Sequence, residues 1–146
     1  MENVSFTLLE LNAEVISMIE KIRFNAYGID DAEFISSFYL NALNDGQYVA
    51  YGAFYDNKLI GACYVSKSYN SLFIEQLFIL KKFQRSGLHL GSGLLKYVLS
   101  QKDYIETYFA STFDYSYLDS VNDATSLYES MGYRQSKNLL MRKRLR

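Results

Sequence analysis

The sequence predicts an α/β fold in which helices cover a mixed, mostly antiparallel sheet, with the elements in the order βααβββαβαβ. Apolar residues alternate with polar ones, as in strands, at the start, middle and end of the chain, and they recur with the period of a helix in between. The chain has 146 residues, of which 49% are hydrophobic and 21% charged, as is typical of one globular domain. No repeat or linker divides it, so residues 1–146 are predicted to form a single domain.

The N-terminal part is predicted to contain one strand and two helices. Val4–Leu11 alternates apolar and polar side chains, which indicates a strand. Asn12 follows it and is a preferred N-cap residue, so a helix is expected to begin there and to end at Gly28. A second helical pattern starts at Asp30 or Asp31. The apolar faces of the two helices are Val15, Ile16, Ile19 and Ile22 in the first, and Phe34, Ile35, Phe38 and Leu43 in the second.

The middle of the chain predicts an antiparallel meander of three strands. Two runs of β-forming residues, Gln47–Tyr55 and Lys58–Ser66, are joined by Asp56-Asn57, which favours a tight hairpin turn. Ser71–Leu80 is the most hydrophobic segment of the chain and predicts the third strand.

The C-terminal part predicts a helix, a strand, a second helix and a final strand. Leu90–Leu99 has the helical spacing, and Phe113–Tyr117 alternates like a strand. Asn122–Met131 predicts the second helix, which Gly132 ends at the C-cap position. Tyr133–Arg146 predicts the terminal strand, with a turn at residues 136–138 as an option.

Charge and cysteine content restrict the partners and the compartment. The net charge of −1 provides no overall basic field for nucleic acid or an anionic membrane. The single cysteine, Cys63, cannot form an internal disulfide, and the chain has neither a signal-peptide pattern nor a membrane-spanning apolar run. We therefore expect a cytoplasmic protein without nucleic-acid or membrane partners. The basic run at residues 142–146 keeps nucleic-acid association as an alternative, which strongly salt-dependent binding would reveal.

The connection between the third strand of the meander and the next helix carries the strongest functional signal. Gly87, Gly91 and Gly93 let the backbone approach a ligand closely, and the amides at the start of a helix bind anionic oxygens. The spacing matches neither G-x-x-x-x-G-K-[ST] nor G-x-G-x-x-G. By itself, this pattern fits a tight turn without a ligand equally well.

In its context, this connection resembles the pyrophosphate loop of the GCN5-related N-acetyltransferases (the GNAT family), whose pattern is [QR]-x-x-G-x-[GA]. The matching residues are Gln84-Arg85-Ser86-Gly87, while His89 stands where the family has glycine or alanine. Either the loop is two residues longer than usual or its helix starts later, and His89 contacts a phosphate or caps the turn. The resemblance implies a GNAT-like three-layer sandwich that uses acetyl-CoA as its acyl donor.

A second segment resembles the C-terminal motif of the same family, N-x-x-A-x-x-L-Y-x-x-x-G-[FY]. Residues 121–133 read V-N-D-A-T-S-L-Y-E-S-M-G-Y, with Tyr128 in register and Asn122 one position late. The resemblance also implies that the strand before the loop splays from its neighbour and pairs with the pantetheine arm of the cofactor. The cofactor-binding residues that it implies are Leu77, Phe78, Ile79, Gln84, Arg85, Ser86, Gly87, Leu88, His89, Gly91, Ser92, Asn122 and Tyr128.

The resemblance also implies catalytic roles. Tyr128 would be the general acid that protonates the departing thiolate, for which a phenol with a pKa of about 10 is suited. The backbone amide of Phe78 or Ile79 would polarise the thioester carbonyl. Glu75, on the strand that leads to the loop, is the candidate base for the amine, and an ordinary polar residue of an alternating strand is an equal alternative.

Two other carboxylates, Asp114 and Asp119, are weaker candidates for the base. No group of His, Cys and carboxylate residues has metal-ligand spacing, so no metal is expected.

The sequence thus predicts an N-acetyltransferase that moves the acetyl group of acetyl-CoA to a primary amine of a small molecule or peptide, by direct attack in a ternary complex. A GNAT-fold module that binds coenzyme A without catalysis is the alternative. Edge strands and surface tyrosines leave a homodimer as an option.

Overall fold

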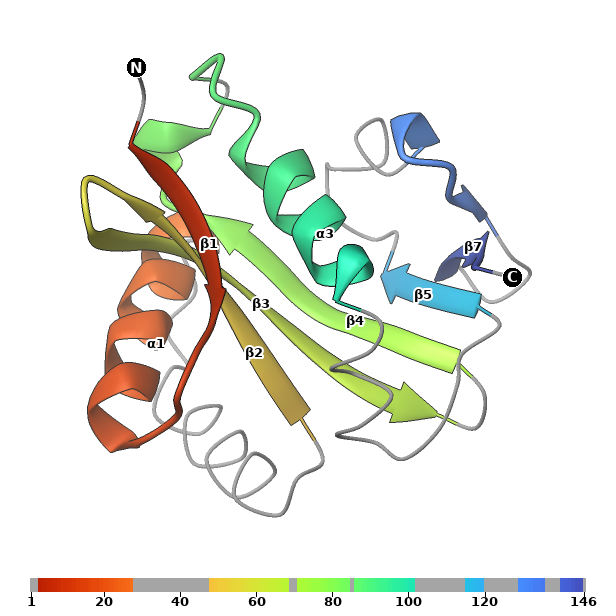
Figure 1. Ribbon diagram of the computed structural model, residues 1–146, viewed down its shortest axis with the longest axis horizontal. Coiled ribbons are helices and arrows are strands. Elements are labelled where there is room, and N and C mark those ends of the chain that lie inside the picture. The colour runs from red at the N-terminus through yellow and green to blue at the C-terminus, as the bar shows by residue number, and fades with distance from the viewer. Residues whose placement is uncertain are drawn as a thin grey trace.

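The computed structural model describes residues 3–27, 48–68, 71–84, 86–101, 115–119, 129–135 and 140–145. Its centre is a seven-stranded sheet with the strand order β1-β2-β3-β4-β5-β7-β6 (Figure 1). Neighbouring strands are antiparallel except β4 and β5, which are parallel, so the predicted mixed, mostly antiparallel sheet is confirmed. The elements are β1 (Val4–Leu8), α1 (Ala13–Tyr27), β2 (Tyr48–Tyr55), β3 (Lys58–Ser68), β4 (Ser71–Ile79), the 3-10 helix η1 (Lys81–Phe83), α3 (Leu90–Ser100), β5 (Tyr115–Asp119), β6 (Arg134–Gln135) and β7 (Leu140–Arg144).

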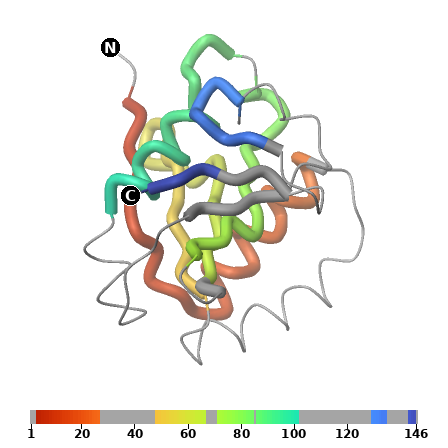
Figure 2. The backbone as a smooth tube through the Cα atoms, turned by 90° about the vertical axis from the view of Figure 1, so that its right-hand side faces the viewer, coloured from red at the N-terminus to blue at the C-terminus, as the bar shows by residue number. Residues whose placement is uncertain are grey.

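Helices α1 and α3 lie on opposite faces of the sheet, which gives the molecule three layers (Figure 2). On one face, Ile16, Ile19 and Ile22 of α1 are buried against the strands. On the other, α3 buries Leu94 and Leu95. Each of these side chains contributes roughly 1.5–3 kcal/mol through its removal from water. No helix in the described ranges is long and apolar enough to cross a membrane.

The start of α1 confirms the predicted N-cap. The backbone amide of Val15 donates a hydrogen bond to Oδ1 of Asn12 at 2.9 Å, and the amide of Ile16 donates to the carbonyl oxygen of Asn12 at 3.0 Å. The side chain therefore satisfies one of the helix amides that has no partner within the helix. The predicted end at Gly28 and the second helix from Asp30 or Asp31 lie outside the described residues.

Replacing Asn12 with alanine is expected to lower the free energy of unfolding by about 1 kcal/mol, because a cap hydrogen bond is lost. Urea denaturation of the variant and the wild type measures this difference. Asn3→Ala is the matched control, since it removes only an exposed side-chain hydrogen bond to Asp56. Equal stabilities of the two variants would show that Asn12 does not act as a cap.

The hairpin between β2 and β3 has the predicted turn. Asp56 and Asn57 have positive φ angles of 49° and 65°, which the two central residues of a type I′ turn require. Asn and Asp adopt this left-handed conformation more readily than other non-glycine residues. The register shifts by one residue between Ala53 and Phe54, so a bulge lies close to the turn.

The C-terminal end departs from the simple prediction of one terminal strand. Within the predicted range Tyr133–Arg146, β6 and β7 pair antiparallel with each other, and β7 also pairs with β5. The optional turn at residues 136–138 lies outside the described residues. Gly132 follows the helical residues Glu129 and Ser130 with a φ of +95°, as expected for a glycine that ends a helix.

Candidate active site

The sheet opens between its two parallel strands. β4 pairs with β5 only from Ser71 to Ile74, opposite Tyr115 to Leu118. Beyond Ile74, no described residue pairs with the β5 side of β4, although β4 continues to Ile79. We call this part of β4, where it has parted from β5, the open edge; it is similar to the splayed strand implied by the resemblance (Figure 1).

Hydrogen bonds to β3 show which backbone groups face this open edge. The amide of Leu80 donates to the carbonyl oxygen of Ile60 at 2.8 Å, and Phe78 lies opposite Ala62 in the same antiparallel register. Because the peptide groups of a strand alternate in direction, those of Phe78 face β3, whereas those of Leu77 and Ile79 face the open edge. Of the two amides predicted to polarise a carbonyl, that of Ile79 has the suitable direction.

Two side-chain hydrogen bonds fix the chain after β4. Nε2 of Gln84 donates to the carbonyl oxygen of Ile79 at 2.8 Å, so this side chain lies on the open edge. The amide of Lys81 donates to Oδ1 of Asn25, near the end of α1, at 2.9 Å. The connection to α3 is thus held both by β4 and by the helix on the opposite face of the sheet.

The turn before α3 has the geometry of an anion-binding site. Gly87 has a φ of +83°, and His89 has a left-handed conformation with φ 52° and ψ 44°. Helix α3 begins at Leu90, directly after His89, whose side chain makes no capping hydrogen bond. The amide of Leu88 donates a long hydrogen bond of 3.4 Å to Oγ of Ser86.

The first amides of α3 have no partner within the helix. Its first intrahelical hydrogen bond runs from the amide of Gly93 to the carbonyl oxygen of His89, at 2.8 Å. The amides of Leu90, Gly91 and Ser92 come before this bond and point out of the helix N-terminus, where the helix dipole also favours negative charge. Gly93 lets this end of α3 pack on β1, because a Cβ there would stand 2.8 Å from Cζ of Phe6.

Glu75 lies at a bulge in β4, on the face of the sheet that α1 covers. The register against β3 shifts between Tyr64 and Val65, so that Glu75 is the extra residue between the pairs Tyr64–Gln76 and Val65–Ile74. Its Oε1 accepts a hydrogen bond of 2.5 Å from Oγ of Ser66, which fixes the orientation of the carboxylate. The bulge thus interrupts the regular alternation of side chains between the two faces of the sheet, and it places a carboxylate where the pairing of β4 with β5 ends.

Tyr48, at the start of β2, belongs to the same cluster. It lies opposite Ser66 in the β2–β3 register. Burial, and to a lesser degree the negative charge of Glu75, raise the pKa of the Tyr48 phenol, so it stays neutral at physiological pH. The sequence indicated Glu75 alone, because the contribution of Tyr48 and Ser66 depends on how β2, β3 and β4 pair.

The remaining predicted site residues are not all described. Arg85, Asn122, Tyr128 and Asp114 lie outside the described residues, so their roles stay predictions. Asp119 is the last residue of β5 and pairs with Leu140 of β7. Among the described residues, no three His, Cys, Asp or Glu side chains are grouped so that they could hold a metal ion.

Cys63 is completely buried in β3, as predicted for a small apolar core residue. Burial raises the pKa of its thiol, which keeps it in the unreactive protonated form. We expect the native protein not to react with Ellman's reagent, and the protein unfolded in guanidinium chloride to release one equivalent of thiolate. Rapid reaction of the native protein would contradict this burial. Because Cys63 is inert, a thiol-release assay of acyl transfer measures only the thiol of the coenzyme A that is released.

Comparison with known proteins gives the same fold. The family model described as an acetyltransferase (GNAT) domain matches residues 15–146. The structure is similar to a protein from Desulfovibrio desulfuricans described as an acetyltransferase of the GNAT family, with 15% identity, a TM-score of 0.75, and coverage of 98% of this chain and 99% of that one. None of the curated proteins matches this sequence.

Two further similar structures contain the coenzyme. One is the PaiA N-acetyltransferase from Thermoplasma acidophilum in complex with coenzyme A, at 18% identity and a TM-score of 0.67, with 96% of this chain and 99% of that one covered. The other is a GNAT-family acetyltransferase from Elizabethkingia anophelis with acetyl-CoA bound, at 18% identity and a TM-score of 0.69, with 98% and 99% covered. At these identities, the similarity shows a common fold.

Proposed function

This chain belongs to the GNAT acetyltransferase family, and we propose that it transfers the acetyl group of acetyl-CoA to a primary amine of a small molecule or a peptide. The observation that carries the proposal is the open edge of β4 leading directly into the Gly87 turn and the start of α3. A strand edge suits the amide-containing arm of a ligand, and the helix amides that follow it along the chain suit a pyrophosphate.

The described residues fit coenzyme A. A Cβ placed on Gly87 would meet no atom within 4 Å, so the turn is open on the side where a phosphate would approach. The amides of Gly91 and Ser92 would bind the pyrophosphate oxygens, and the pantetheine arm would lie along β4 beside Ile79. Two structures of similar fold contain coenzyme A or acetyl-CoA, which supports this assignment.

The proposed chemistry is direct transfer in a ternary complex. The amine nitrogen attacks the thioester carbonyl carbon while the amide of Ile79 donates a hydrogen bond to the carbonyl oxygen. Glu75 accepts the proton that the amine loses, directly or through a water molecule, and the C–S bond breaks. Tyr128 donates a proton to the departing sulfur, so that the products are an N-acetyl amide and free coenzyme A.

The cluster around Glu75 also bears on the acceptor. Glu75 carries a negative charge beside the hydroxyl groups of Ser66 and Tyr48, which suits the binding of an ammonium group before it is deprotonated. We therefore propose a cationic amine as acceptor. The absence of an internal disulfide fits our proposal that the protein acts in the cytoplasm.

Turnover with a panel of amines tests this function. Free coenzyme A is measured by thiol release with polyamines, amino acids, aminoglycosides and peptides of different N-terminal residues as acceptors. We expect a cationic amine to be acetylated, and Tyr128→Phe to lower kcat at least about tenfold through loss of the proton donor. Tyr97→Phe is the matched control, because Tyr97 packs on Phe6 and Tyr51, away from the Gly87 turn. Binding of acetyl-CoA without turnover of any amine would instead favour a coenzyme A-binding module.

A further inference from the structure

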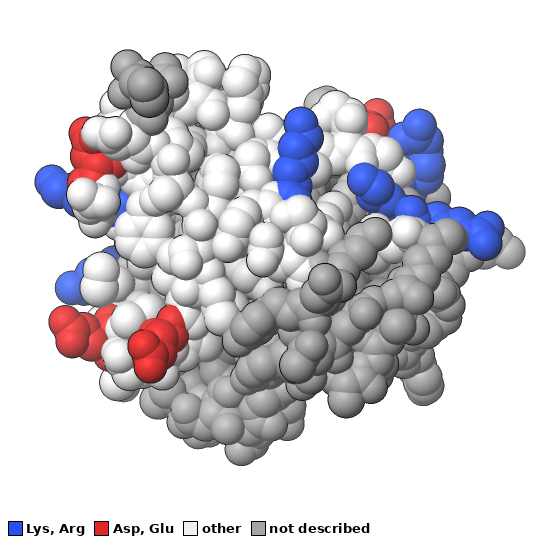
Figure 3. Space-filling view, viewed as in Figure 1, with Lys and Arg blue, Asp and Glu red and all other residues white. Residues whose placement is uncertain are grey.

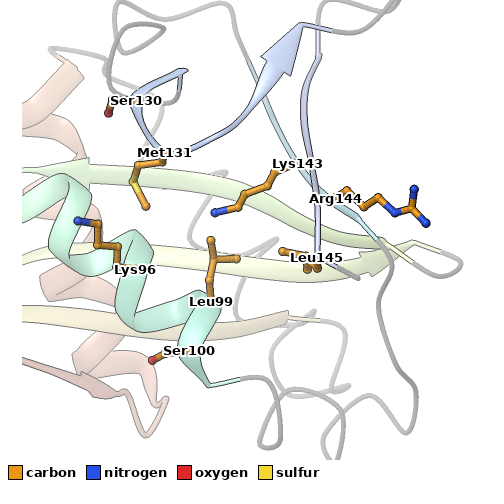
Figure 4. Close-up of a pocket in the computed structure, with 8 residues that line it drawn as sticks. All are labelled: Lys96, Leu99, Ser100, Ser130, Met131, Lys143, Arg144 and Leu145. Carbon is orange, nitrogen blue, oxygen red and sulfur yellow. The ribbon is translucent and has the colours of Figure 1, made fainter.

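A hollow of about 560 Å³ lies between the second half of α3 and β7 (Figure 4). Its volume falls within the range of roughly 300–1,000 Å³ that small-molecule sites occupy. Leu99 and Met131 form an apolar floor and are only 9% and 8% exposed, and Leu145 adds a third apolar side chain. None of the predicted cofactor-binding or catalytic residues that the structure describes lines this hollow.

The charged side chains in the described lining of the hollow are all basic. Lys143 points into it, between Met131 and Leu99, whereas Lys96 lies at its rim and Arg144 points away (Figure 4). Within the described ranges, no Asp or Glu lines the hollow and neither Lys96 nor Lys143 forms an ion pair. On the face of the molecule in Figure 3, Lys and Arg side chains gather towards the end where β7 lies, and most acidic side chains lie at the opposite end.

We propose that this hollow binds a small organic carboxylate, with its charge at Lys143 and its apolar body on Leu99, Met131 and Leu145. A single ammonium group beside an apolar floor matches a single negative charge, and an ammonium and a carboxylate form a charge-assisted hydrogen bond. A doubly charged phosphate fits less well than a carboxylate, because the nearby C-terminus of α3 is the negative end of the helix dipole and repels two charges more strongly than one.

The hollow lies away from the described part of the proposed acetyl-CoA site, the Gly87 turn and the first residues of α3. Lys96 comes six residues after Leu90, the first residue of α3, which corresponds to about 9 Å along the helix axis. The two ligands would therefore lie at different ends of the same helix and bind together. The proposal does not depend on acetyl transfer.

The test uses NMR of the full chain labelled with [¹³C-methyl]methionine, titrated with sodium octanoate. We expect the methyl signal of Met131, assigned with Met131→Leu, to shift in a saturable manner. The signal of Met18, which is 44% exposed on α1, serves as the internal control and should not move. The shift should persist in saturating acetyl-CoA, and the uncharged isostere octanamide should bind at least tenfold more weakly.

Two charge variants locate the anion. Lys143→Gln should weaken octanoate binding at least tenfold, whereas Lys21→Gln, the same change at an exposed position of α1, should leave it unchanged. An unmoved Met131 signal, equal binding of octanamide and octanoate, or displacement of octanoate by acetyl-CoA would each overturn the proposal. These outcomes are read on the wild type, so they hold even if Lys143→Gln fails to fold. Acetyl-CoA binding is measured separately, so its failure would leave the octanoate result unaffected.

Discussion

Replacing Gly87 with glutamate is expected to weaken acetyl-CoA binding at least about a hundredfold, or about 2.7 kcal/mol. The new carboxylate would stand in the turn where the pyrophosphate is proposed to bind, and would repel it at the end of a helix that otherwise favours anions. Since a Cβ at Gly87 meets no atom within 4 Å, the free protein can accept the side chain with only the strain of its positive φ. Isothermal titration calorimetry with acetyl-CoA measures the effect.

The matched control is Gly132→Glu. Gly132 also has a positive φ, of +95°, and a Cβ there would make only ordinary contacts, at 3.5 Å or more, with Lys143. The control therefore introduces the same charge and a similar backbone strain outside the turn, beside Lys143, and acetyl-CoA affinity should be retained. If both variants bind as the wild type does, or if the wild type itself fails to bind at millimolar acetyl-CoA, the cofactor site is wrongly placed and only the fold is shared with the acetyltransferases.

Glu75→Gln is expected to lower kcat about a hundredfold with the best amine of the panel, because the variant keeps the shape of the side chain but cannot accept a proton. Its affinity for acetyl-CoA should stay within twofold of the wild type, since Glu75 lies on the face of the sheet covered by α1 and not on the Gly87 turn. Steady-state kinetics and calorimetry on the same preparation separate the two effects.

Glu10→Gln provides the control for Glu75→Gln, because it removes a carboxylate from an exposed position between β1 and α1. Its kcat should equal that of the wild type. Ser66→Ala removes the hydrogen bond that orients Glu75 and should reduce kcat less than Glu75→Gln does. An unchanged kcat in Glu75→Gln would assign the base to another residue, and Asp119 at the end of β5 is then the next to test.

The elements that could be predicted from the sequence are those whose cause is local. Asn12 caps α1 through its own side chain, and Asp56-Asn57 supplies the left-handed conformations of a tight turn. The predicted helix Leu90–Leu99 differs from α3 by one residue at its C-terminal end, since apolar spacing defines both its ends.

The arrangement around Glu75 could not be predicted, because two bulges determine it. A regular hairpin that starts from the pair Tyr55–Lys58 would place Tyr48 opposite Val65, but the shift at Ala53 moves it opposite Ser66. The second bulge makes Glu75 an extra residue of β4 without a partner position in β3, so its side chain does not follow the regular alternation between the two faces of the sheet. A one-residue shift sends a side chain to the other face of a sheet, and no local sequence signal marks either shift.

The limited pairing of β4 with β5 has a consequence for how the protein folds. Strands β2, β3 and β4 follow one another in the sequence and pair through short connections, whereas the four pairs between Ser71–Ile74 and Tyr115–Leu118 join distant parts of the chain. Distant contacts cost more loop-closure entropy and form later, so we expect β5 and β7 to dock on a meander that is already formed. Acetyl-CoA bound between β4 and β5, as proposed, would connect an early-folding unit to a late one, and we expect its binding to slow hydrogen exchange in β5 and β7.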